Sequence, residues 1–142
     1  MTRFCAGSFN RGGPSMSAEL VREWVKKAEE DWVALSRLRR GGVAEVADVI
    51  TFHAQQCGEK YLKALIQKEG REPPRTHHLP TLLDLLVPSY PDLEALRVSC
   101  EGLTPYAILY RYPGGEAGQE DAEEAVRHAE KLRAVLRKSL GI

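Results

Sequence analysis

Four polar side chains recur along one stretch of the sequence at helical spacing. His53, Gln56, Lys60 and Lys63 follow one another at intervals of three, four and three residues, so on a helix they share one face. Two lysines and a glutamine on one face have the donors to hold a phosphate and the edge of a base. The competing interpretation is a solvated face on which Glu59 and Lys63 form an ion pair.

A pair of histidines follows a proline-rich connector. His77 and His78 come directly before a leucine-rich segment that begins at Leu79, where a histidine often satisfies the free amides at a helix start. The alternative is that His77 contributes to a ligand site. Adjacent histidines suit metal chelation poorly, and no carboxylate lies at ligand spacing. We therefore expect no metal and no cofactor.

The third candidate is Arg111-Tyr112, which stands before Pro113 and a pair of glycines. The planar guanidinium of arginine matches phosphate geometry, and a tyrosine can stack on a base. In the structural alternative, Arg111 closes the carboxyl end of a helix while Tyr112 packs between helices. The residues alone leave both roles open.

The elements that must position these side chains are helical. Apolar residues recur at spacings of three and four, and no segment shows sustained period-two alternation. Helices are predicted at 18–40, where Ser17 is the cap, and at 43–69, which ends at Gly70. A short helix with Pro80 in its first turn follows, then an element that begins at a cap, Asp92, and ends at Pro105. The last predicted helix is 119–140. The run 106–110 is ambiguous, and we favour helix there. The fold class is therefore all-α, an antiparallel up-and-down bundle of four to five helices.

The first 17 residues show no hydrophobic period and contain glycines, a proline and serines. Such a segment contributes nothing to a core. We expect residues 1–17 to be a disordered tail, with Met16 as an alternative native start, and residues 18–142 to be one helical domain.

Composition narrows the class of protein. Twenty basic and twenty acidic residues give a formal net charge of zero, so any site for a polyanion must be a local patch. No apolar run is long enough to span a bilayer and the start has no signal-peptide core, which predicts a cytoplasmic protein. The cysteines, Cys5, Cys57 and Cys100, lack metal-site spacing and should be reduced thiols, with Cys57 in the core.

Three ordered blocks resemble the HEPN domain, the nucleotide-binding domain of higher eukaryotes and prokaryotes. They are residues 52–64 (FHAQQCGEKYLKA), residues 76–79 (THHL) and residues 111–113 (RYP), the last before an acidic final helix. The resemblance implies a helical bundle that usually forms homodimers, with a minimal nucleotidyltransferase often encoded nearby. It also implies that the neighbouring lysines, glutamine and arginine bind a nucleotide or RNA.

One departure from the family bears on catalysis. Many HEPN members are metal-independent ribonucleases in which a histidine follows an arginine by four to six residues and acts on the RNA 2′-hydroxyl. No histidine stands in that window after Arg111, and the next one, His128, falls within the last helix and is expected at the surface. The chain therefore resembles the branch with an Arg-Tyr-Pro signature, for which nucleotide binding is the implied role.

These observations give a leading hypothesis and two alternatives. The leading one is a non-catalytic, dimeric nucleotide- or RNA-binding subunit that serves a minimal nucleotidyltransferase as substrate-binding partner or as half of a toxin–antitoxin pair. Its predicted site residues are Gln56, Lys60, Lys63, His77, Arg111 and Tyr112. The alternatives are a divergent ribonuclease that uses Arg111 with His53, His77 or His128, and a plain dimerisation or scaffold module.

Overall fold

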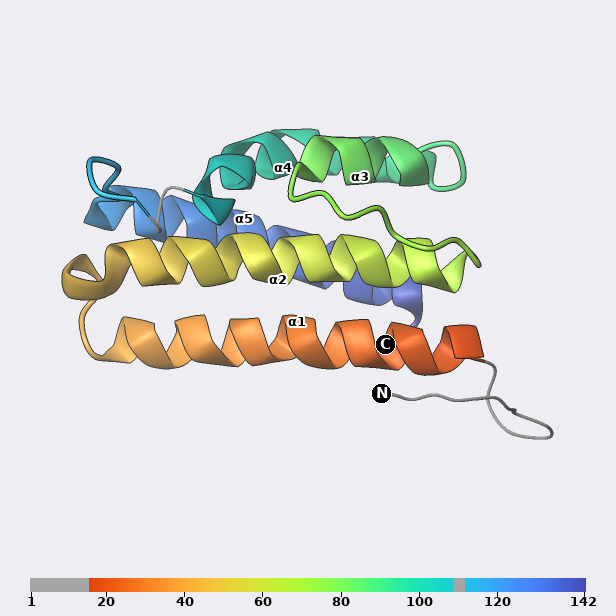
Figure 1. Cartoon of the computed structure of the whole chain (residues 1–142), viewed down its shortest axis with the longest axis horizontal. Coiled ribbons are helices and arrows are strands. Elements are labelled where there is room, and N and C mark those ends of the chain that lie inside the picture. Colours follow the sequence, from red (N-terminus) through yellow and green to blue (C-terminus); the bar gives the residue numbers. More distant parts are fainter. Residues whose placement is uncertain (1–15, 109–111) are drawn as a thin grey trace.

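The fold is taken from a computed structural model that describes residues 16–108 and 112–142. Over these residues the chain forms five α-helices, linked in part by short 3-10 segments (Figure 1). Their bounds are α1 Met16–Arg40, η2 Ala44–Val46, α2 Ala47–Lys68, α3 Leu79–Leu86, η3 Pro91–Leu96, α4 Arg97–Leu103, η4 Thr104–Ala107 and α5 Gln119–Leu140. Residues 1–15 of the predicted tail, and Arg111, lie outside the described ranges.

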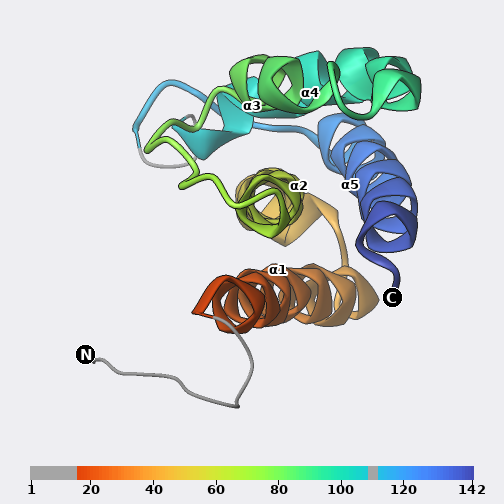
Figure 2. The same cartoon turned by 90° about the vertical axis from the view of Figure 1, so that its right-hand side faces the viewer.

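Helix α2 is the centre of the molecule. Viewed near its axis, α1, α5 and the α3–α4 pair surround it (Figure 2). Helices α1 and α2 run antiparallel, whereas α5 runs in the same direction as α2. Ala117 N donates to Asp48 Oδ1 (2.6 Å) near the start of α2, and Lys68 Nζ donates to Leu140 O (3.3 Å) near its end. The extended connector 71–78 returns along α2, so α3 starts beside the middle of α2 (Figure 1).

The predicted apolar stripes form the core. In α2 the residues Ile50, Ala54, Cys57, Tyr61 and Leu65 are fully buried. The predicted stripe of α5 is buried as well, and its members are Ala122, Ala125, Ala129, Leu132, Leu136 and Leu140. Burial of this apolar surface from several sides of α2 is the main force that holds the bundle together. Among the described helices, none is both long and apolar enough to cross a membrane.

Proline and glycine set the helix ends near the predicted site. Gly70 has φ +83° and follows the last turn of α2, a conformation that glycine adopts without steric cost. Pro80 lies in the first turn of α3, where its missing amide hydrogen costs no helical bond. The connector between these two residues contains Pro73 and Pro74, and its course along α2 determines where His77 lies.

Several local predictions are wrong. Helix α1 begins at Met16, so Ser17 lies within it, and its Oγ donates to Gln67 O (2.8 Å) instead of capping the helix. Asp92 is no cap, because η3 begins at Pro91, whose fixed φ already suits the first position of a helical turn. In the ambiguous run, helical structure ends at Ala107 and Ile108 is a turn, while residues 109–110 lie outside the described part.

Candidate functional site

A buried carboxylate on α2 gathers three of the predicted site residues. Glu59 is only 4% exposed. Its Oε2 accepts from Lys63 Nζ (2.9 Å), and its Oε1 accepts from Gln55 Nε2 (3.1 Å) and Gln56 Nε2 (3.3 Å) and lies 2.9 Å from His77 Nδ1. The first three donors come from α2 itself, while His77 reaches in from the connector. The structure therefore brings Gln56, Lys63 and His77 to a single acceptor. We call Glu59 and the four side chains around it, those of Gln55, Gln56, Lys63 and His77, the Glu59 cluster.

A second buried carboxylate holds the other predicted lysine. Asp31 of α1 is 7% exposed. Its Oδ2 accepts from Lys60 Nζ at 2.6 Å, and its Oδ1 lies 2.7 Å from His53 Nδ1. The two lysines of the predicted stripe are thus bound to different carboxylates, Lys60 to Asp31 of α1 and Lys63 to Glu59 of α2.

The predicted ion pair between Glu59 and Lys63 is confirmed, but the solvated face is wrong. The Lys63 side chain is 8% exposed, and its Nζ also lies 5.6 Å from the centre of the Trp24 ring. Helix α1 covers this face from one side and the connector covers it from the other (Figure 2). Helical spacing predicts which side chains share a face, but it does not reveal what packs over that face.

The Glu59 cluster fixes the connector and orients an imidazole. Gln55 Nε2 also donates to His77 O (3.1 Å), so His77 is held by its backbone and its ring. Nδ1 of the ring faces the Glu59 carboxylate, so the other ring nitrogen, Nε2, takes no part in this bond. The His77 side chain is 58% exposed. The helix cap expected from the histidine pair is wrong, because His78 at the N-cap of α3 makes no side-chain cap bond and the amide of Leu79 donates to Thr104 Oγ1 (3.2 Å).

A family model described as HEPN domain matches residues 21–139. The chain belongs to the HEPN domain family. The crystal structure of TT1696 from Thermus thermophilus is similar, with a TM-score of 0.67 and 25% identity over 83% of this chain and 96% of that chain. No curated protein matches. The family predicted from three sequence blocks is confirmed, and so is the all-helical bundle.

The third block of this HEPN domain is only partly described. Arg111 lies outside the described residues, so its predicted place beside the lysines stays a prediction. Tyr112 lies in the loop before α5 and is 62% exposed, so the alternative in which it packs between helices is wrong. The loop is tied to the start of α2 by the bond between Ala117 N and Asp48 Oδ1.

The histidine of α5 was expected at the surface and is instead packed. The His128 side chain is 19% exposed, and its Nδ1 lies 3.0 Å from Ser99 Oγ of α4. A Cβ on Gly102 would lie 2.8 Å from His128 Nε2, so the ring occupies the space that this glycine leaves. With His53 on Asp31 and His77 on Glu59, each histidine of the ribonuclease alternative has a hydrogen-bond partner within the fold.

Sequence reasoning missed the groups that organise these side chains. Asp31 and Gln55 have no motif of their own, because their partners are distant in sequence or lie on the neighbouring helix face. Trp24 was also missed. It stands seven residues, or two helical turns, before Asp31 on α1, so the two side chains share a helix face, and this spacing could have indicated it. Across residues 16–108 and 112–142, no group of three or more His, Cys, Asp or Glu side chains is placed to hold a metal ion.

Proposed function

We propose that the protein is a nucleotide- or RNA-binding HEPN subunit that forms a dimer in the cytoplasm. In this proposal it acts with a minimal nucleotidyltransferase, either as its substrate-binding partner or as one half of a toxin–antitoxin pair. Membership of the HEPN family supports the class of ligand. In this proposal Arg111 and Tyr112, which precede α5 in the sequence, also bind the ligand.

The observation that carries the proposal is the Glu59 cluster with Lys60 beside it. An ammonium has three N–H donors. The contacts of Lys60 with Asp31 and of Lys63 with Glu59 each engage one donor, which leaves donors on both lysines for phosphate oxygens. The exposed ring of His77 adds a group held in one orientation. Side chains that are already ordered lose little conformational entropy when a ligand binds.

Calorimetry with ATP, other nucleotides and short RNA tests this function. The wild type is expected to bind, and Lys60→Ala or Arg111→Ala to bind about tenfold more weakly, which corresponds to one charge-assisted hydrogen bond. Lys60→Ala removes the ion pair of Asp31 but leaves its bond with His53, so circular dichroism of the variant is compared with the wild type before binding is measured. Arg127→Ala is the matched control, because Arg127 is exposed on α5.

Two results would contradict the proposal. One is the absence of binding by the wild type, and the other is equal binding by Lys60→Ala, Arg111→Ala and Arg127→Ala. A protein that forms a stable dimer by light scattering but binds no ligand would instead be the scaffold module.

A further inference from the structure

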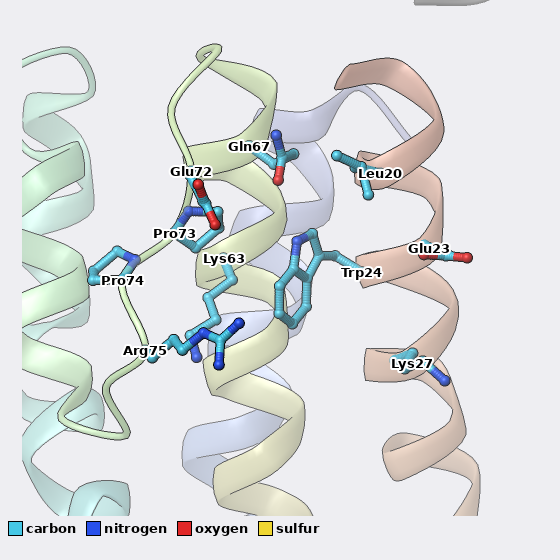
Figure 3. Close-up of a pocket in the computed structure, with 10 residues that line it drawn as sticks. All are labelled: Leu20, Glu23, Trp24, Lys27, Lys63, Gln67, Glu72, Pro73, Pro74 and Arg75. Carbon is cyan, nitrogen blue, oxygen red and sulfur yellow. The ribbon is translucent and has the colours of Figure 1, made fainter. Parts of the chain in front are cut away.

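A cavity of about 480 Å³ lies between α1, α2 and the connector (Figure 3). It is lined by Leu20, Glu23, Trp24, Lys27, Lys63, Gln67, Glu72, Pro73, Pro74 and Arg75. This volume falls in the range of small-molecule sites. Lys63 belongs both to the cavity and to the Glu59 cluster, but the rest of the cavity's lining was not predicted to bind anything. The cavity therefore adjoins the Glu59 cluster through Lys63, and its other lining residues form a further place where a small ligand fits.

One wall of the cavity is suited to a planar ring. The indole of Trp24 projects from α1 toward Lys63, and the carboxamide of Gln67 lies beside it (Figure 3). An indole face stacks on a base of any sequence. A carboxamide can both donate to and accept from the edge of such a ring.

The opposite side of the cavity is suited to a single phosphate. The Arg75 guanidinium lies near Lys63 (Figure 3), is exposed, and has no hydrogen bond or ion pair with any residue in the described ranges. Its planar fork matches phosphate geometry. Lys27, Glu23 and Glu72 also line the cavity, and Glu59 already pairs with Lys63. The three carboxylates balance the charges of Lys27, Lys63 and Arg75, so a monophosphate fits the cavity better than a triphosphate.

The wall that carries Arg75 is held at both ends. Before it, Arg71 Nη2 donates to Leu85 O at 2.6 Å. After it, His77 is bound to Glu59 and Gln55. Two prolines between these anchors restrict the backbone further. A preorganised wall lowers the entropic cost of binding.

We propose that this cavity is a second binding site, which takes a planar base bearing one 5′-phosphate. The base lies against Trp24, and the phosphate lies between Arg75 and Lys63. Two sources share this chemistry: a free mononucleotide and the 5′-monophosphate end of an RNA chain. The site shares Lys63 with the one proposed above but is otherwise lined by different residues, so it is tested separately.

Tryptophan fluorescence reports directly on this site. The chain has two tryptophans, so Trp32→Phe leaves Trp24 as the single emitter. In that background, AMP, UMP or a 5′-phosphorylated RNA trinucleotide is titrated. We expect saturable quenching by at least one of them, which identifies the source, and about tenfold weaker binding after Arg75→Ala. Arg22→Ala is the matched control, since Arg22 is exposed on α1 and does not line the cavity.

Four outcomes would overturn the second site. They are no saturation by any of the three ligands, equal affinity in Arg75→Ala and Arg22→Ala, equal affinity for ribose 5-phosphate, which has no base, and tighter binding of ATP than of AMP. Lys60→Ala separates this site from the first one. It should weaken ATP or RNA binding in calorimetry and leave quenching by the monophosphate unchanged.

Discussion

Two buried carboxylates determine what the lysines of α2 can do. Removing an ionised carboxylate from water is costly unless it is paired and hydrogen-bonded. Asp31 is paired with Lys60, and Glu59 is paired with Lys63 and accepts from further donors. The lysines are consequently fixed in position and their charge is largely balanced. Ligand binding at this face would depend on placed donors more than on a strong positive potential.

Removal of the Glu59 carboxylate should destabilise the fold strongly. Glu59→Ala leaves the ammonium of Lys63 buried without its partner, since that side chain is 8% exposed, and it also releases His77. Loss of one partner of a buried pair typically costs about 3–5 kcal/mol. Chemical denaturation of wild type and variant measures the change in the free energy of unfolding.

The matched control for this prediction is Glu94→Ala. Glu94 is paired with Arg97 at the surface, where its side chain is 54% exposed, and exposed pairs contribute little to stability. Equal effects of Glu59→Ala and Glu94→Ala would contradict the view that the Glu59 cluster holds the connector in place.

At the scale of elements, the close approach of α4 and α5 depends on a glycine. Gly102 of α4 leaves the space that the His128 ring of α5 fills, and the bond to Ser99 holds that ring in position. From the sequence, His128 was expected at the surface of the last helix. A glycine on a neighbouring helix carries no local signal that could have corrected this expectation.

Gly102→Ala should be destabilising in the wild type and harmless once His128 is removed. The new Cβ would lie 2.8 Å from His128 Nε2, and overpacking of this kind costs about 1–3 kcal/mol. In a His128→Ala background the space is open. Alanine then adds up to about 1 kcal/mol through its higher helix propensity. Thermal or chemical unfolding of the four proteins in this double-mutant cycle measures the difference, and equal effects in both backgrounds would refute the packing argument.

For the whole molecule, local periodicity predicted the bundle and tertiary contacts determined the site. The stripes of α2 and α5 were read correctly because burial repeats along each helix. The Glu59–Lys63 pair was also accessible, because its spacing is local. The links from Glu59 to His77 and from Asp31 to Lys60 span 18 and 29 residues. They depend on the course of the connector and on the register of α1, which single-sequence patterns do not contain.

A further polar cluster joins three helices of the bundle. Glu29 of α1 accepts two bonds from Arg133 of α5, Nε to Oε2 at 2.7 Å and Nη2 to Oε1 at 2.8 Å. It also accepts from the hydroxyl of Tyr61 of α2. The bonds from Arg133 are the main cause of a lowered Glu29 pKa, whereas burial is the main cause that raises the pKa of Tyr61 to about 12. This carboxylate therefore couples the attachment of α1 to pH.

Acid should weaken the bundle partly through Glu29. A glutamate in the unfolded chain titrates near about 4.3, and in the fold the pKa of Glu29 is lower. As the pH falls through this window, the unfolded chain takes up the proton first, so stability falls. The free energy of unfolding of Glu29→Gln should lie below that of the wild type at neutral pH, and the gap should narrow as the pH drops from about 6 to about 3. In an Arg133→Ala background the main cause of the lowered Glu29 pKa is gone, so the stability difference made by Glu29→Gln should lose most of its pH dependence. If that difference is constant with pH in the background that retains Arg133, α1 is held without this carboxylate.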